Sequence, residues 1–287
     1  MSDLLDRQIL LIGLPNTGKT SFLAALWFMV NQSTVKCRLT LEKLFGDSKY
    51  LNEICEAWLE YRPVKRNQLD SVKLVAMTLK NRENDRLVRL SIPDLSGESF
   101  SLQWTNRQLT SGYDEQLRKA SGGILFVHPE SILKPTRIDT VTELAMASGD
   151  VVPLENIEQT ATAETKPWDS GKSPTQVQLV ELLQFISSRV HFQPPFRLAI
   201  VVSAWDLLID LSETPEKWVS DQLPLLRQFL SCHKSIFDVV FYGVSAQGGR
   251  YDSSPIPQKL PAHRVSVVGD SVSNSHDITE PIQWLMH

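Results

Sequence analysis

The sequence is poor in cysteine and has no long hydrophobic run. Its 3 cysteines, Cys37, Cys55 and Cys232, lie far apart and none forms a C-x-x-C pair, so we expect neither a disulfide framework nor a zinc site. No apolar stretch approaches the roughly 20 residues that a membrane span needs, and the first residues lack the basic segment of a signal peptide. The sequence therefore predicts a cytoplasmic protein with reduced thiols.

The sequence also lacks an excess of positive charge. Lysine and arginine number 29 against 33 aspartates and glutamates, which gives a formal net charge of −4. Dedicated nucleic-acid-binding proteins usually carry a basic surface, so we expect no nucleic-acid partner. The hydrophobic fraction, 42%, is ordinary for a soluble globular protein, and a chain of 287 residues can bury a sizeable core.

Short apolar runs alternate with amphipathic segments along most of the chain. Residues 72–79 and 87–92 flank a short polar turn, which predicts a β-hairpin. The alternation predicts an α/β fold: a mostly parallel sheet with one antiparallel hairpin strand and helices on both faces. We expect buried strands at 8–12, 124–127, 197–202 and 239–244, and helices at 22–30, 47–61, 106–120, 173–193, 214–231 and 279–285, with a kink at Pro224 in the helix 214–231.

The chain is expected to form a single domain over residues 1–287. Residues 129–172 are rich in Thr, Glu and Ser, which predicts a polar insertion. Residues 250–278 are rich in Pro and Ser and predict a second, loop-rich insertion before the C-terminal helix. Ser173-Pro174 is typical of a helix N-cap and first turn.

The segment 13–20 matches the full pattern G-x-x-x-x-G-K-[ST] between a predicted strand and a predicted helix. Glycines let successive backbone N–H groups point at phosphate oxygens, and the helix adds its positive N-terminal end. Lys19 would reach the β- and γ-phosphates and the Thr20 hydroxyl would ligate Mg²⁺. The alternative, an ordinary strand-to-helix turn, is disfavoured because the full pattern rarely arises by chance. The nucleotide-binding residues predicted here are Gly13, Pro15, Asn16, Thr17, Gly18, Lys19, Thr20 and Ser21.

A second motif, residues 94–98, follows the second strand of the predicted hairpin. The Asp94 carboxylate could hold Mg²⁺ through water. Gly97 could give its backbone N–H to a γ-phosphate, because it has no side chain to obstruct the approach. The pattern D-x-x-G is common on its own, but its position after a hairpin and downstream of segment 13–20 favours the functional interpretation.

Two further motifs follow later predicted strands. Asp206, in the segment 203–206, could accept from both N1–H and N2–H₂ of guanine, a pair of donors that adenine lacks. The alternative is that Asp206 only caps a turn. In the segment 245–249, which Ser245 opens, the backbone N–H of Ala246 could meet guanine O6, whereas the glycine pair that follows could form only a turn.

These motifs, in this order, resemble those of a Ras-type, TRAFAC-class P-loop GTPase. The segments 94–98, 243–249 and 280–285 are similar to the bacterial double-GTPase families, which are associated with predicted conflict or antiviral defence systems. The resemblance implies a small-GTPase-like fold that binds GTP or GDP with Mg²⁺ as cofactor. It implies catalytic roles for Glu98, Gly97 and Lys19. It also implies a protein partner, either an effector or a partner GTPase.

The sequence departs from the family pattern where the base is read. Ser203 and Ala204 stand in place of the usual [NT]-K pair, and Gln247 replaces the lysine of S-A-K. The missing lysine normally lies along the base plane, so guanine affinity could be weaker. Trp205 could supply apolar surface instead, and a core position for Trp205 is the equal alternative.

Other departures concern catalysis. Glu98 occupies the place where many relatives have a water-orienting Gln, and its charge would repel the γ-phosphate. The loop before the hairpin has no threonine, and Asn67 and Ser71 are the nearest substitutes. Arg62 or Arg66 could act as an arginine finger in cis, although a solvated loop charge is the favoured interpretation of each. His128 follows a predicted strand and could face the site, although a structural or surface histidine is the favoured interpretation.

The sequence therefore predicts a slow GTPase that acts as a nucleotide-dependent switch. One alternative is a regulatory module that holds nucleotide with little or no hydrolysis. Another is a P-loop kinase, which would need arginines in a lid, and the segment 129–172 offers only Arg137. ATP is not excluded as the nucleotide.

Overall fold

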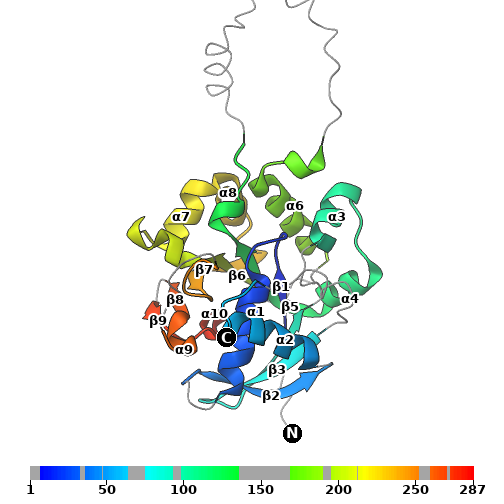
Figure 1. The fold of residues 1–287 in the computed structure, drawn as a ribbon. Helices are drawn as coiled ribbons and strands as arrows, with labels where there is room; N and C mark the ends of the chain where they lie inside the picture. Colours follow the sequence, from blue (N-terminus) through cyan, green and yellow to red (C-terminus); the bar gives the residue numbers. More distant parts are fainter. Residues whose placement is uncertain are drawn as a thin grey trace, which may run out of the picture.

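The computed structural model describes residues 7–32, 36–46, 48–63, 75–92, 98–135, 169–189, 195–211, 213–251, 259–269 and 272–287. Within these ranges the strands form one 9-stranded sheet in the order β2-β3-β4-β1-β5-β6-β7-β8-β9 (Figure 1). The strands are β1 (Arg7–Ile12), β2 (Leu39–Phe45), β3 (Val75–Asn81), β4 (Leu87–Ile92), β5 (Ala120–Val127), β6 (Phe196–Ser203), β7 (Phe237–Ser245), β8 (Ser266–Gly269) and β9 (Val272–Ser275).

The centre of the sheet is parallel and both edges are antiparallel. β1 lies between β4 and β5 and pairs in parallel with both, and β5, β6 and β7 continue the parallel order. The pairs β2–β3, β3–β4, β7–β8 and β8–β9 are antiparallel. The carboxyl ends of the parallel strands therefore meet at one edge, where α/β sheets bind ligands.

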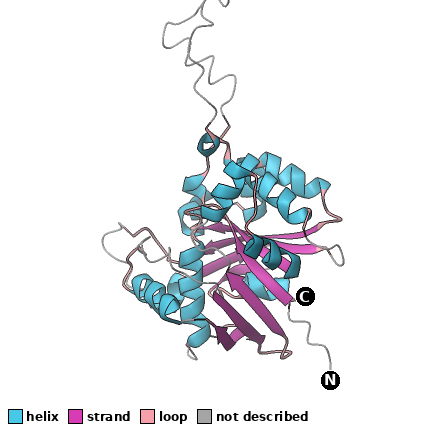
Figure 2. Ribbon diagram, turned by 90° about the vertical axis from the view of Figure 1, so that its right-hand side faces the viewer, coloured by secondary structure: helices cyan, strands magenta, loops and turns pink. Residues whose placement is uncertain are grey.

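Helices cover both faces of the sheet, as Figure 2 shows. Helices α1, α2 and α10 contribute to the hydrophobic cluster on one face, and α3, α4, α6, α7 and α8 contribute to that on the other. Side chains of β1 alternate between them: Ile9 and Leu11 belong to the first cluster, Leu10 and Ile12 to the second. The helices are α1 (Lys19–Asn31), α2 (Ser48–Leu59), α3 (Glu98–Asn106), α4 (Ser111–Lys119), α6 (Thr175–Ser187), α7 (Pro215–Gln222), α8 (Pro224–Cys232), α9 (Pro261–Arg264) and α10 (Glu280–Leu285), with short 3₁₀ turns η2 (Pro129–Ser131), η4 (Ser170–Lys172) and η5 (Trp205–Leu211).

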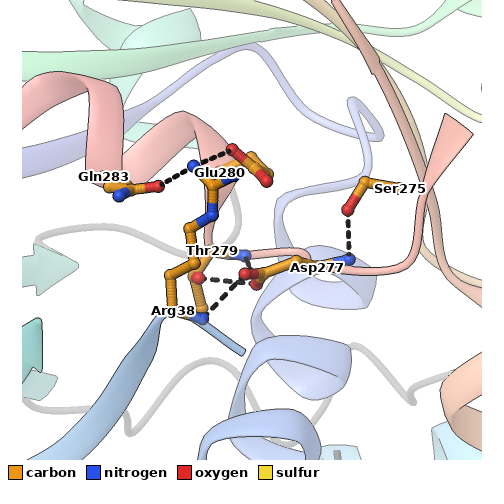
Figure 3. A network of polar contacts seen from close by, with 6 residues as sticks. All are labelled: Arg38, Ser275, Asp277, Thr279, Glu280 and Gln283. Atoms are coloured by element: carbon orange, nitrogen blue, oxygen red, sulfur yellow. Dashed lines mark hydrogen bonds and ion pairs between the residues drawn. The ribbon is translucent and has the colours of Figure 1, made fainter. Parts of the chain in front are cut away.

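A buried polar network fixes α10 against the start of β2 (Figure 3). The Asp277 carboxylate accepts from the backbone N–H of Arg38 at 2.8 Å and from the N–H and hydroxyl of Thr279 at 2.9 and 2.6 Å. The Arg38 guanidinium donates to the Gln283 side chain at 2.9 Å and lies 3.5 Å from the Glu280 carboxylate. Burial raises the pKa of Glu280, and Arg38 opposes that rise. The network thus joins two segments that are distant in the chain.

The mixed α/β sheet with a largely parallel core and the β3–β4 hairpin were predicted correctly, but the prediction of one antiparallel strand was wrong. β2 was missed because its edge position mixes apolar with charged residues. The segment 250–278, expected to be loop-rich, contains α9, β8 and β9. Of the expected insertion 129–172, the structure describes only the two ends.

Three helix boundaries also differ from the prediction. The helix expected at 106–120 begins only at Ser111, because Thr110 caps α4 by accepting from the N–H of Tyr113, and Asn106 is instead the last residue of α3. The helix expected at 214–231 with a kink at Pro224 is two helices, since α7 ends at Gln222 and Pro224 opens α8. Pro174, not Ser173, is the N-cap of α6, without a side-chain cap. Among the helices described, none is long and apolar enough to cross a membrane.

Candidate functional site

The segment 13–20 turns from β1 into α1 with a glycine at the helix start. Gly18 is the N-cap, with a left-handed φ of 87°, and no side chain caps the helix. A helix N-terminus without a capping side chain presents its first N–H groups to a ligand, and its dipole favours an anion. Asn16 lies exposed at the tip of the loop, beside Pro15. The Thr17 hydroxyl donates to the Leu14 carbonyl at 2.8 Å and closes the loop on itself.

The Lys19 ammonium lies within this loop. Its side chain is buried, and Nζ donates to the carbonyls of Gly13 at 2.6 Å and Leu14 at 2.8 Å. The Phe100 ring, from α3, lies 5.9 Å from Nζ. A phosphate oxygen bound by this loop would lie beside the buried ammonium, and such an anion stabilises a buried positive charge.

The loop is in van der Waals contact with the end of β6. A Cβ added to Gly18 would lie 2.8 Å from the Ser203 Cβ and 2.9 Å from its Oγ. The Ser203 hydroxyl donates to the Val127 carbonyl at 3.2 Å. Ser203, which stands where the GTPase pattern has Asn or Thr, therefore joins the ends of β5 and β6 to segment 13–20.

A cavity of about 350 Å³ opens where the strand ends meet, a size within the range of small-molecule sites. It brings together Gly18 and Ser21 from the first motif, Ser203, Ala204 and Asp206 from the third, and Ala246 from the fourth. Ser245, predicted beside Ala246, is buried and accepts from the Gly248 N–H at 3.1 Å. Segments that are distant in the sequence thus share one cavity.

In the turn after β6, Asp206 lines the cavity whereas Trp205 is buried in the core. Asp206 is partly exposed and lines the cavity. Trp205 is 5% exposed, and a Cβ added to Gly243 would meet its ring at 2.3 Å. Of the two alternatives for Trp205, the structure therefore supports the core position, and the absence of a side chain at Gly243 makes room for it.

Trp58, at the end of α2, fixes the loop after β7. Its indole Nε1 donates to the Ala246 carbonyl at 2.9 Å. Its own carbonyl accepts from the Gln247 side-chain amide at 3.4 Å and from the Arg264 guanidinium at 3.1 Å. The sequence analysis did not single out this role, because an indole in an amphipathic helix gives no signal beyond burial.

The cavity lining also includes residues outside the four motifs. His128 lines it, which was the less favoured of the two alternatives for this residue. Burial lowers the pKa of His128, although the carboxylates of Glu130 and Asp206 act in the opposite direction, and Nδ1 accepts from the Glu130 N–H at 3.2 Å. Glu130 forms an ion pair with Arg250. The position of His128 directly after β5 was the available signal.

Several residues predicted to act at the site lie beyond the part of the chain that the structure describes. Asp94 and Gly97 are outside the described residues, and so are Arg66, Asn67 and Ser71. Glu98 begins α3, but its side chain is not among those described. Arg62 is exposed and forms an ion pair with Glu60.

The structure describes one of the two residues predicted to hold Mg²⁺. Thr20 lies in the first turn of α1, immediately after Lys19, where its hydroxyl suits this role. Among the described side chains, no group of three or more His, Cys, Asp or Glu could hold a metal ion. Mg²⁺ at a triphosphate is held by few protein ligands together with phosphates and water, so such an ion would need no cluster of this kind.

Comparison with known proteins gives a family match over almost the whole chain. A family model described as Double-GTPase 1 matches residues 10–285. No curated protein matches the sequence.

Solved structures are similar at low identity. The bacterial selenocysteine-specific elongation factor EF-Sec is 15% identical, with a TM-score of 0.34 over 84% of this chain and only 26% of that one. Putative nucleolar GTP-binding protein 1 from Plasmodium falciparum is 14% identical, with a TM-score of 0.37 over 86% and 81%. The signal recognition particle receptor complex SRb-GTP/SRX from Chaetomium thermophilum is 14% identical, with a TM-score of 0.38 over 84% and 90%.

Proposed function

Because the chain belongs to the Double-GTPase 1 family, we propose that it binds GTP with Mg²⁺ and hydrolyses it slowly, acting as a nucleotide-dependent switch. The resemblance to bacterial conflict-system GTPases extends the proposal to a protein effector or partner GTPase and to a role in defence. The proposal is for guanine in preference to adenine.

The cavity at the strand ends is the observation that carries this proposal. Its lining includes Gly18 and Ser21 beside segment 13–20 as well as Asp206 and Ala246 from the later motifs. A nucleotide with its phosphates on segment 13–20 would reach this cavity with its base. The Asp206 carboxylate offers two acceptor oxygens for guanine N1–H and N2–H₂, and adenine has no such pair of donors.

The phosphate groups would be held by the loop and by α1. The uncapped N–H groups of α1 and the Lys19 ammonium supply positive charge beside the expected β- and γ-phosphates. Thr20 and Asp94 would hold Mg²⁺, which neutralises developing negative charge on the phosphates. Gly97 would give its N–H to the γ-phosphate.

Glu98 is the residue that we propose to orient the attacking water. Its carboxylate can accept a proton from water but also repels the γ-phosphate, so hydrolysis would be slow. The same substitution motivates the second candidate, a module that binds GTP and does not turn it over.

Nucleotide preference is the first test. The melting temperature of the full chain would be measured with GTP, ATP and XTP in the presence of Mg²⁺, for wild type, Asp206→Asn and Lys19→Ala. We expect GTP to stabilise wild type most. Asp206→Asn should favour XTP, because an amide N–H can donate to the C2 carbonyl of xanthine. A shift with ATP alone, or no change of preference in Asp206→Asn, would contradict guanine recognition.

Multi-turnover phosphate release separates the two candidates. We expect wild type to release phosphate faster than Lys19→Ala, and Glu98→Gln to be at least as fast as wild type because the repulsion is removed. If wild type binds GTP and releases phosphate no faster than Lys19→Ala, the chain is a binding module.

A further inference from the structure

The chain after β7 is attached to two other parts of the cavity lining. Arg250 forms an ion pair with Glu130, which follows β5. The Tyr251 hydroxyl lies 3.2 Å from the Ser21 Oγ of α1. All four residues line the cavity, so side-chain contacts hold Arg250 and Tyr251 at it.

The Tyr251 ring is held in place yet only partly covered. Its ring and the Tyr61 ring form a T-shaped pair, with the centroids 6.0 Å apart and an interplanar angle of 67°. Tyr61 is 4% exposed, whereas Tyr251 is 39% exposed and is among the few exposed large hydrophobic side chains in the described part of the chain. An aromatic ring that is held by one neighbour and by its hydroxyl, and that is still exposed, can offer its surface to a ligand.

Tyr251 lies where we expect the nucleoside of a bound nucleotide to pass. Ser21 follows Thr20, so the hydroxyl contact places the ring beside the start of α1, where the phosphates would end. Asp206, the proposed base contact, lines the same cavity. A nucleotide that extends from the loop to Asp206 would therefore pass the ring.

The residues of the third motif would leave one face of the bound base without apolar cover. Ala204 is shorter than the lysine that the family pattern has there, and Trp205 is buried against Gly243. The His128 ring also lines the cavity, but its Nδ1 is engaged by the Glu130 N–H. We propose that Tyr251 stacks on the nucleoside of the bound guanine nucleotide and supplies the apolar cover that the short Ala204 side chain does not reach. This inference rests on the proposed function.

The test compares GDP with inorganic pyrophosphate, which has the phosphates and no nucleoside. Affinities of both would be measured by titration calorimetry for wild type, Tyr251→Ala and Tyr251→Phe. Loss of base–aromatic stacking should weaken GDP binding about five- to hundredfold in Tyr251→Ala. Pyrophosphate affinity should be unchanged, and Tyr251→Phe should retain most of the GDP affinity because the ring remains.

Leu225→Ala is the matched control, because Leu225 is equally exposed, at 39%, and lies on α8 away from the cavity lining. It should bind GDP as wild type does. A change of less than twofold in Tyr251→Ala, or equal losses for GDP and pyrophosphate, would overturn the inference. If wild type prefers ADP, the proposed function fails, and the same titrations with ADP still decide the role of Tyr251, since stacking accepts either purine.

Discussion

Replacing Gly18 with alanine should destabilise the protein for two separable reasons. An alanine at the left-handed φ of 87° costs about 1–2 kcal/mol. The new Cβ would also lie 2.8 Å from the Ser203 Cβ, and such overpacking costs about 1–3 kcal/mol. Together these predict that Gly18→Ala lowers the free energy of unfolding by about 2–5 kcal/mol.

The substitution Ser203→Gly should remove only the steric part of the cost of Gly18→Ala. In Ser203→Gly the opposing side chain is absent, so adding Gly18→Ala should cost about 1–2 kcal/mol, the backbone contribution alone. The free energies of unfolding of wild type, both single variants and the double variant would be measured by urea denaturation without nucleotide. The double-mutant cycle then gives the coupling between the two positions.

Gly112→Ala is the control, because a Cβ added to Gly112 in α4 meets nothing within 4 Å. It should leave stability unchanged or raise it by about 0.4–1 kcal/mol. If the losses in the free energy of unfolding from Gly18→Ala and Ser203→Gly are additive, the close contact between segment 13–20 and the end of β6 is refuted.

Three further predictions concern residues around the site and the core. Trp58→Phe removes the donor to the Ala246 carbonyl, so stability should fall by about 1–3 kcal/mol, and GDP affinity should fall as well. Trp27→Phe, which removes the hydrogen bond to Asn52 instead, should lower stability and leave affinity unchanged; equal affinity losses would refute a specific role for Trp58. Asp277→Asn replaces one acceptor oxygen with an amide NH₂, so the donors at that oxygen lose their acceptor, and it should cost about 1–3 kcal/mol in urea denaturation, whereas Asp238→Asn, at an exposed ion pair, should cost less than about 1 kcal/mol; similar costs would contradict the importance of the network. Because burial lowers the pKa of His128 in the folded state, stability should fall as pH drops through the unfolded pKa of about 6.5. His128→Gln should reduce that fall, and an unchanged pH profile would count against burial as the cause.

The parallel core could be predicted because its strands are buried on both faces. Such strands are continuous apolar runs, as in β5 and β6, and they are visible in the sequence without any knowledge of their neighbours. The edge strands lack this signal. β2 contains the exposed charged residues Glu42 and Lys43, and β8 is only 4 residues long. Their formation depends on pairing with β3 and β7, and the sequence around each edge strand does not specify that pairing.

The same distinction holds at the site. Segment 13–20 and Asp206 follow their strands directly, so local order was enough to select them, and the cavity brings both together. The contacts Glu130–Arg250 and Ser21–Tyr251 join residues 120 and 230 positions apart. Nothing near either residue in the sequence specifies its partner, because these contacts depend on how the strand ends meet in space.

The Asp277 network joins two segments that the ribosome makes at different times. A ribosome makes Arg38 long before Asp277, since 239 positions separate them, and chains fold from the N-terminal part first as they are made. Ile282 and Leu285 of α10 pack in the same cluster as α1 and β1. A nascent chain can therefore contain the complete segment 13–20 while the core beneath it still lacks α10, and competence to bind nucleotide should arise only once α10 has been made.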